Sequence, residues 1–152
     1  MKKFILDTNI VLIYLRENQL SRNLESSLRL MSGTNNLFLS AVSLGELKSI
    51  AKQNKWGNRK LNRMILMLRK FIVVDINLDE VIEQYAEIDT YSQGKLEGSN
   101  VNFSSRNMGK NDLWIAATAS VYDLRLVTTD QDFRHLQNEY IELEEINIDD
   151  YK

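Results

Sequence analysis

The sequence contains no cysteine, no proline and only one histidine. Without cysteine, a disulfide scaffold, a thiolate zinc site and a cysteine nucleophile are all excluded, and the composition suits a reducing cytosol. The single histidine, His135, excludes catalysis by a pair of histidines that act as acid and base. Because His135 adjoins Leu136 in a short predicted helix, we expect it to pack or to face solvent.

Long apolar runs are also missing, since no stretch approaches the roughly 20 residues needed to span a bilayer. The first six residues resemble the start of a signal peptide, but Asp7 and Asn9 interrupt the apolar run at once. We therefore expect a soluble, cytoplasmic protein with no membrane partner. The 152 residues, of which 43% are hydrophobic and 26% charged, fit one globular domain over residues 1–152.

Charge is distributed unevenly, although the net charge is only −2. Between residues 47 and 74 the charged side chains are all basic: Lys48, Lys52, Lys55, Arg59, Lys60, Arg63, Arg69 and Lys70. The C-terminal segment is rich in acids, namely Glu139, Glu142, Glu144, Glu145, Asp149 and Asp150. Two interpretations stay open: one face that attracts an anion and another that repels it, or two ordinary solvated helix faces.

Short apolar segments alternate with segments of helical periodicity along the chain. Strands are predicted over residues 4–6, 37–39, 71–74, 126–128 and 140–143. Helices are predicted over residues 10–16, 21–31, 43–53, 58–70, 78–92, 112–122 and 130–136. This alternation indicates an α/β fold, with helices on both faces of a five-stranded, mostly parallel sheet. Residues 94–109, rich in Gly, Asn and Ser, predict a long loop that is either functional or mobile.

Four acidic residues fall at the same predicted edge of the sheet: Asp7, Glu46, Asp112 and Asp130. Each has a purely local explanation, since Asp7 and Asp130 fit helix N-caps and Asp112 complements a helix dipole. Glu46 fits a capping box with Ser43. Together, however, the four carboxylates repel one another unless a cation neutralises them. Oxygen ligands of this kind suit Mg²⁺ or Mn²⁺, and the nearby helix N-termini suit a phosphate.

Four segments carry a resemblance to a known family. They are FILDTN at 4–9, SLGEL at 43–47, NDLWIAATA at 111–119 and LVTTDQDF at 126–133. In this order, and over nearly the whole chain, they resemble the PIN domain and, within it, the VapC-type toxins of bacterial toxin–antitoxin pairs. The resemblance implies a three-layer α/β/α fold and an endoribonuclease that depends on Mg²⁺ (or Mn²⁺). It places the catalytic, metal-binding acids at Asp7, Glu46, Asp112 and Asp130.

The resemblance also implies partners and products. The expected partners are an RNA substrate, a cognate antitoxin protein and a second copy of the chain in a homodimer. Hydrolysis of the phosphodiester would leave a 5′-phosphate and a 3′-hydroxyl. Asn9 matches a family position beside the first acid, and Thr128 or Thr129 matches a hydroxyl or amide that family members carry near the last strand. For Asp132, both a role at the metal and a position facing solvent stay open.

Basic side chains near the acids are candidates for contact with substrate phosphates. Lys48 and Lys52 lie one helical turn apart on the helix that carries Glu46, and Lys110 lies near Asp112. Arg106, in the long loop, is a further candidate, and such contacts weaken as salt rises. For the two aromatic residues Tyr14 and Trp114, we expect the core or a dimer contact rather than base stacking.

Two other functions fit parts of the pattern. A phosphatase or phosphotransferase with Asp7 as nucleophile usually needs a second aspartate two positions later, where this chain has Asn9. The second alternative is a catalytically silent module that uses the PIN fold only for binding, because a fold by itself does not establish activity.

Overall fold

A computed structural model describes residues 2–152, and its centre is one five-stranded sheet in the order β3-β2-β1-β4-β5. All four neighbouring strand pairs are parallel. The strands are β1 (Lys3–Leu6), β2 (Asn36–Ser40), β3 (Phe71–Val74), β4 (Arg125–Thr128) and β5 (Glu142–Glu145). The predicted sheet is therefore confirmed, and it is wholly parallel in the described part of the chain.

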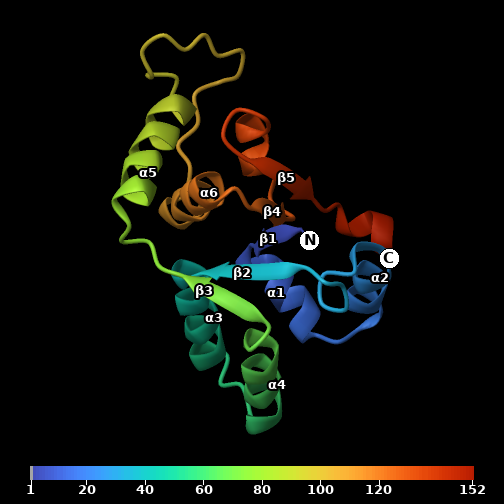
Figure 1. Ribbon diagram of the computed structural model, residues 1–152. Helices are drawn as coiled ribbons and strands as arrows, with labels where there is room; N and C mark the ends of the chain where they lie inside the picture. The colour runs from blue at the N-terminus through green and yellow to red at the C-terminus, as the bar shows by residue number, and fades with distance from the viewer. Residues whose placement is uncertain (1) are drawn as a thin grey trace.

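Helices cover both faces of this sheet, as Figure 1 shows. Below it in that view lie α1 (Thr8–Leu15), α3 (Ala41–Gln53) and α4 (Asn58–Leu68), with α2 (Gln19–Leu28) beside them. Above it lie α5 (Asp79–Ser92), α6 (Lys110–Tyr122) and the 3-10 helix η1 (Gln131–Leu136). A second 3-10 helix, η2 (Ile148–Tyr151), lies near the C-terminus. This arrangement confirms the three-layer α/β/α architecture.

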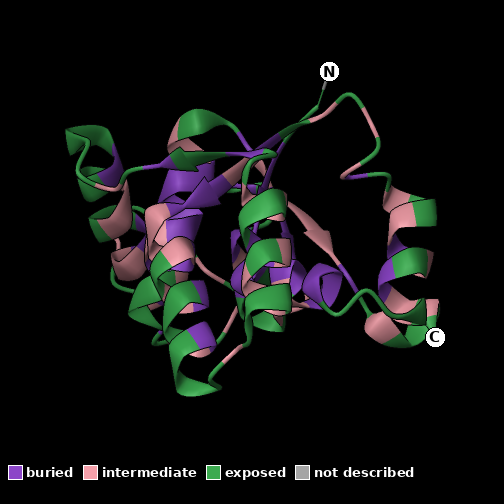
Figure 2. Ribbon diagram, turned by 90° about the horizontal axis from the view of Figure 1, so that it is seen from below, coloured by how far each residue is buried: buried purple, intermediate pink, exposed green. Residues whose placement is uncertain are grey.

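The sheet separates two hydrophobic clusters, one on each face. Successive side chains of β1 point to opposite faces, so β1 contributes residues to both clusters. Phe4 and Leu6 join the cluster under α1 and α3, whereas Ile5 joins the cluster under α5 and α6. Ile5 and Leu6 have no solvent exposure, because β1 is the central strand and helices cover both its faces. Figure 2 shows buried strands in the middle and exposed outer helix faces. In residues 2–152, no helix has the length and apolar character that a membrane span requires.

The last strand begins two residues later than predicted. Leu136 accepts hydrogen bonds from the backbone N–H groups of Glu139, Tyr140 and Ile141, and Asn138 has a positive φ of 65°. The chain therefore turns through residues 137–141, where the apolar pattern predicts a strand. Pairing with β4 begins only at Glu142, opposite Arg125.

Candidate metal centre

Acidic side chains gather at the carboxyl edge of the sheet, where β1 and β4 lie side by side. From β1 the chain passes to β2 on one side, whereas β4 lies on the other side of β1. The strand order therefore reverses beside β1, and in open parallel sheets ligands bind at this position. The helices α1, α3 and α6 and the 3-10 helix η1 contribute the side chains described below.

Asp7 directly follows β1 and caps α1, as its sequence context predicts. Its Oδ1 accepts a hydrogen bond from the Thr8 backbone N–H at 2.8 Å, and its Oδ2 accepts one from the Thr128 hydroxyl at 2.7 Å. The side chain is buried. Burial raises the pKa of Asp7, and the nearby charges of Glu46 and Asp130 raise it further, against the effect of the two hydrogen bonds.

Glu46 lies in the second turn of α3, and the predicted capping box with Ser43 is wrong. The helix begins at Ala41, two residues earlier than predicted, because the Ser40 side chain at the end of β2 caps it by accepting from the Val42 N–H at 3.1 Å. The Ser43 hydroxyl is buried and has no hydrogen-bond partner within residues 2–152. Glu46 Oε1 instead accepts a hydrogen bond from the Thr8 hydroxyl at 3.0 Å. Thr8 thus orients two acids, a role that the sequence analysis missed.

Asp112 lies in the first turn of α6, half-buried. Burial and then the negative charge of Asp7 raise the pKa of Asp112 to about 7, and Asp130, Glu46 and Asp132 add to the shift. Gly109, the N-cap residue of α6, provides no side-chain cap. A Cβ at Gly109 would lie 3.6 Å from Asp112 Oδ2, so this carboxylate lies close to the start of its own helix.

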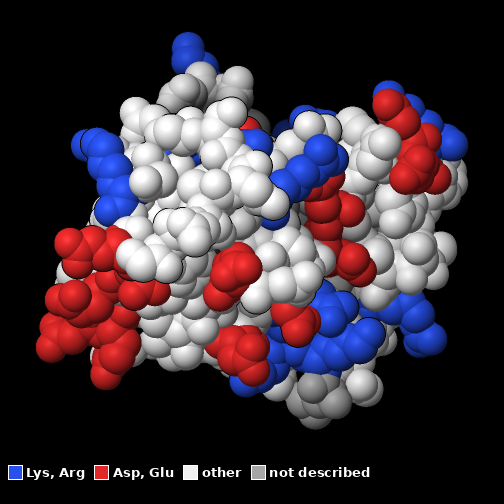
Figure 3. All heavy atoms as spheres, turned by 90° about the horizontal axis from the view of Figure 1, so that it is seen from above, with Lys and Arg blue, Asp and Glu red and all other residues white. Residues whose placement is uncertain are grey.

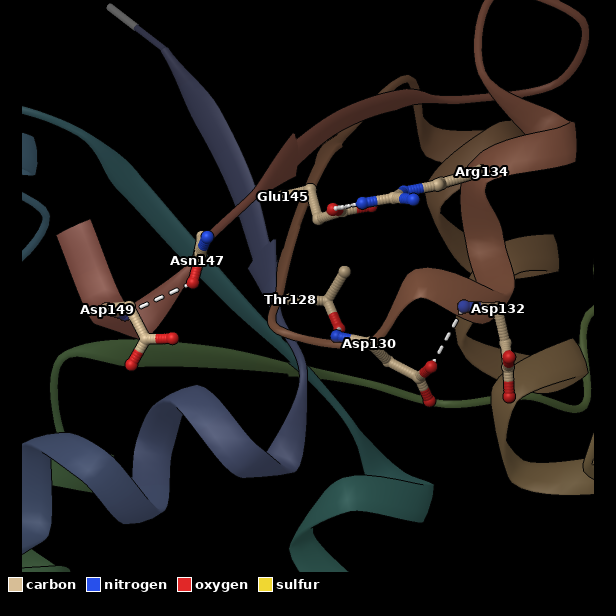
Figure 4. Close-up of polar contacts among 7 residues, drawn as sticks. All are labelled: Thr128, Asp130, Asp132, Arg134, Glu145, Asn147 and Asp149. Atoms are coloured by element: carbon tan, nitrogen blue, oxygen red, sulfur yellow. Dashed lines mark hydrogen bonds and ion pairs between the residues drawn. The ribbon is translucent and has the colours of Figure 1, made fainter.

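Asp130 and Asp132 come from the start of η1 and lie side by side in Figure 4. Asp130 Oδ1 accepts a hydrogen bond from the Asp132 backbone N–H at 2.9 Å, so Asp130 is an N-cap, as its position predicts. The Asp130 N–H in turn donates to the Thr128 hydroxyl at 3.0 Å. Thr128 therefore ties Asp130 to Asp7, because the same hydroxyl donates to Asp7 Oδ2.

Three of these acids can bring oxygen atoms to one point. One carboxylate oxygen each of Asp112, Asp130 and Asp132 lies within 4.8 Å of the other two. Hard cations such as Mg²⁺ and Mn²⁺ take oxygen ligands, so this donor set suits them. Asp7 and Glu46 lie outside this group of three, but their charges act on Asp112. The structure therefore brings Asp132, whose role the sequence leaves open, next to two of the predicted ligands.

No basic side chain neutralises these acids within residues 2–152. Ion pairs form elsewhere: Arg125 with Glu142, Arg134 with Glu145, Arg63 with Glu17, and Lys152 with Asp149. Three acids of the C-terminal segment thus have basic partners, and Figure 3 shows basic side chains beside several acidic patches on the face that it presents. At the carboxyl edge of the sheet, Asp7, Glu46 and Asp130 accept hydrogen bonds, but these acids form no ion pair within residues 2–152.

The predicted substrate-binding residues lie in different places. Asn9 is exposed on α1, and Lys110 is exposed at the start of α6, close to Asp112 in the chain. Lys48 and Lys52 line a hollow of about 290 Å³ between α3 and α4, together with Trp56, Leu61 and Met64. Since about 3.6 residues make one helical turn, this side of α3 is roughly opposite Glu46.

Side chains for which the sequence indicated packing do pack. The Tyr14 ring is buried, and its hydroxyl donates to Glu25 Oε1 at 3.0 Å. Trp114 lies against Tyr85, with ring centroids 4.3 Å apart. His135 lies beside Phe103 at 5.1 Å in the cluster under α5 and α6. Thr129 is half-buried, whereas Thr128 is buried and makes the hydrogen bonds at the site.

Comparison with known proteins gives one family and several solved structures. The family model for the PIN domain matches residues 4–139. VapBC2 from Rickettsia felis, bound to a DNA fragment from its promoter, has 24% identity and a TM-score of 0.73 over 95% of this chain and 98% of the other. VapBC-1 from nontypeable Haemophilus influenzae has 19% identity and a TM-score of 0.69, over 93% and 96%.

A third solved structure is a member of the VapBC family of toxin–antitoxin systems, VapBC-5 from Mycobacterium tuberculosis. It has 20% identity and a TM-score of 0.61, over 94% of this chain and 98% of the other. Comparison with curated proteins gives no match. At these identities the structural likeness shows the fold alone, so the chemistry has to be argued from the site.

Proposed function

The chain belongs to the PIN domain family, and from this we propose that it is a metal-dependent endoribonuclease, the toxin of a toxin–antitoxin pair. The observation that carries the proposal is the group of carboxylate oxygens from Asp112, Asp130 and Asp132 within 4.8 Å of one another. Asp7 and Glu46 add negative charge beside this group. Such a concentration of unneutralised acids is costly for a protein without a cation.

We assign the ligands by their position. Asp112, Asp130 and Asp132 would hold Mg²⁺ or Mn²⁺, with Asp7 and Glu46 completing the site directly or through water. A bound divalent cation supplies Lewis acidity and neutralises charge when water attacks a phosphodiester. Thr128 and Thr8 hold Asp7 and Glu46 in place by their hydroxyl groups, so these carboxylates are oriented before any ligand binds.

The chain's own groups also suit the phosphate. The N-terminus of α6 has no side-chain cap, so its first N–H groups and its positive dipole end are free to face an anion. Lys110 adds a positive charge at this helix start, and Asn9 lies two residues after Asp7. Lys48, Lys52 and Thr129 stay further candidates for RNA contact. As the family resemblance implies, water would attack the phosphorus and the 3′-oxygen would leave, which gives a 5′-phosphate and a 3′-hydroxyl.

We also propose the partners that the relatives suggest. VapBC complexes of similar fold support an antitoxin as partner. A second copy of the chain is supported by exposed apolar side chains on α4, on the edge strand β3 and near the start of α5, namely Ile65, Leu66, Ile72, Val73, Leu78 and Ile82. Exposed apolar side chains on an edge strand favour association. Light scattering of the purified protein would show twice the monomer mass.

The direct test of activity is cleavage of total RNA by purified protein with Mn²⁺ or with a chelator. We expect Mn²⁺-dependent fragments with 5′-phosphate ends, and a loss of at least about 100-fold for Asp7→Asn and Asp112→Asn, which remove central charges. Asp149→Asn, an exposed acid on η2, is the matched control and should cleave at the wild-type rate. Cleavage that persists with chelator, or in Asp112→Asn, would contradict the proposal.

The toxin role needs a separate test in cells. Expressed alone, the protein should arrest growth, and Asp112→Ala should relieve the arrest. If the purified protein binds Mn²⁺ but cleaves no RNA, the alternative of a catalytically silent PIN-fold binding module would replace the nuclease proposal. Sequencing the 5′ ends of RNA fragments after brief induction would identify the target.

A further inference from the structure

A partly buried hydrogen bond joins the end of α5 to η1. The Ser92 hydroxyl lies 2.7 Å from His135 Nε2, and Ser92 has no solvent exposure. Ser92 is the last residue of α5, and His135 lies on η1, three residues after Asp132. The contact therefore links a helix that carries none of the site's acids to the short helix that carries Asp132 and has Asp130 as its N-cap.

The same hydroxyl also contacts Met108, just before the N-cap residue of α6. Ser92 Oγ lies 3.4 Å from Met108 Sδ, and Met108 directly precedes Gly109, the N-cap residue of the helix that carries Asp112. The Arg106 backbone N–H also donates to the Ser92 carbonyl at 2.7 Å. One buried serine thus contacts η1 and the segment that leads directly into α6.

The long segment between α5 and α6 returns to Ser92 before α6 begins. Residues 93–109 extend outward from the ends of these two helices, as Figure 1 shows. The Ser105 hydroxyl donates to the Gln93 carbonyl at 3.0 Å, so together with the Arg106 contact the returning chain is held against the end of α5. The segment therefore returns to α6 in a position that depends on Ser92.

Two further polar contacts hold η1: the ion pair of Arg134 with Glu145, and the hydrogen bond from the Asp130 N–H to the Thr128 hydroxyl. The remaining contacts of its side chains are apolar. Phe133 and Leu136 are fully buried, and the His135 ring lies 5.1 Å from the Phe103 ring. Apolar burial depends on area and not on direction, and short 3-10 helices have poor internal hydrogen-bond geometry. His135 Nδ1 is buried without a hydrogen-bond partner in residues 2–152, so Ser92 is the side chain that forms a hydrogen bond with this ring.

We propose that Ser92 and His135 are positioning residues of the metal centre. Their hydrogen bond, with the Met108 contact, holds Asp130 and Asp132 on η1 at a set distance from Asp112 on α6. The proposal rests on the proposed function for the identity of the ligand, a divalent cation. It assigns a role to residues 93–109 as well. The contact of Arg106 with Ser92 determines where this segment leads into α6 relative to η1.

Four variants test this role. Ser92→Ala removes the hydroxyl, and His135→Leu removes the ring nitrogen with little change in volume. His135→Gln keeps a side-chain nitrogen near the position of Nε2 and is the conservative variant. Ser120→Ala is the matched control, because the Ser120 hydroxyl accepts from Gln84 Nε2 at 2.9 Å and joins the same two helices, α5 and α6, away from η1.

The first readout is Mn²⁺ affinity by titration calorimetry at pH 7.5, with circular dichroism to verify folding. We expect affinity to fall about tenfold or more in Ser92→Ala and His135→Leu, as for other residues that orient metal ligands. His135→Gln should stay within about threefold of wild type, and Ser120→Ala should match it. Wild-type affinity in folded Ser92→Ala and His135→Leu would overturn the proposal and leave the proposed function standing.

The second readout, amide hydrogen exchange of the metal-free protein, does not depend on metal binding. Exchange in residues 131–136 and 110–113 should be faster in Ser92→Ala and His135→Leu, but unchanged in Ser120→Ala. If wild type binds no Mn²⁺, the proposed function fails, while faster exchange confined to these segments still supports the positioning role. Wild-type exchange in Ser92→Ala and His135→Leu would overturn it.

Discussion

Charged side chains are arranged differently at the two ends of the parallel strands. At the amino end, Arg125 pairs with Glu142 at 2.9 Å, and a hollow of about 530 Å³ has side chains of both signs, Lys2, Arg29 and Glu144 among them. At the carboxyl end, Asp7, Glu46, Asp112, Asp130 and Asp132 form no ion pair within residues 2–152. Arg134 pairs with Glu145 at the carboxyl end of β5, but the five acids beside β1 and β4 have no such partner, so negative charge accumulates there.

This difference indicates which end of the sheet needs a ligand. At the carboxyl end, burial and then the charges of the neighbouring acids raise the pKa of Asp112 to about 7, so the acids are balanced either by protons or by a cation. Exposed ion pairs such as that of Arg125 with Glu142 contribute little to the free energy of unfolding, and their charges are balanced without a ligand. The following predictions separate the two ends, from the largest expected effect to the smallest.

The largest effect is stabilisation by metal. Mn²⁺ at 100 times its dissociation constant should raise the free energy of unfolding by about 2.7 kcal/mol, because it binds the folded chain only. Thermal unfolding at pH 7.5 with and without Mn²⁺ measures this. Asp112→Asn should lose the effect, whereas Arg125→Ala should keep all of it. Equal stabilisation of Asp112→Asn would place the metal elsewhere.

A second prediction concerns two aspartates in equivalent positions on short 3-10 helices. Asp132 and Asp149 both donate their N–H to the preceding N-cap side chain, of Asp130 and Asn147 respectively, as Figure 4 shows. Asp132→Asn should weaken Mn²⁺ affinity by at least about tenfold, because only Asp132 lies in the carboxylate group. Calorimetric titration of Asp149→Asn should give the wild-type value. Identical Mn²⁺ affinities in the two variants would show that Asp132 is not a ligand of the metal.

The third prediction is a dependence of metal affinity on pH. A cation must displace the proton of Asp112, whose pKa is about 7. Mn²⁺ affinity should therefore fall about fivefold from pH 7 to pH 6 and about tenfold from pH 6 to pH 5. Titration calorimetry over this range measures the slope. A flat profile would mean that Asp112 is already ionised at pH 5.

The fourth prediction concerns the metal-free protein. The pKa of Asp112 is about 7 in the folded chain against 3.8 in the unfolded chain, so the folded chain keeps a proton between those values. Stability therefore falls as pH rises from about 4 to about 7. Above pH 7, Asp112→Asn should be more stable than wild type by roughly 1 kcal/mol, a figure reduced for solvent screening of a half-buried group. Denaturant titrations at pH 8 and pH 4 measure this gain, which should vanish at pH 4.

The smallest effect belongs to the amino end of the sheet. Arg125→Ala breaks an ion pair whose side chains are 39% and 63% exposed, so stability should change by about 0–1 kcal/mol. Mn²⁺ affinity and RNA cleavage should stay at wild-type values. A large loss of metal affinity in this variant would show that the two ends of the sheet are coupled.

Much of the fold was predictable because its signals are local. The apolar run of β3 matches residues 71–74, and Asp7 and Asp130 are the caps that their positions predict. The capping box at Glu46 failed because two serines, Ser40 and Ser43, both precede the helix pattern. Strand β2 pairs with β3 as far as Ser40, so the helix can begin directly after this residue. Ser40 and not Ser43 is therefore the N-cap of α3.

The sequence by itself determined the order of strands and helices, and with it the edge of the sheet to which the acids belong. Side-chain periodicity and turn residues are properties of neighbours in the chain, so they can be read without coordinates. Only the tertiary structure decided which carboxylates meet, because Asp112 and Asp132 come from separate elements whose spacing depends on packing. The same holds for Ser92 and His135, 43 residues apart, which make one hydrogen bond between α5 and η1.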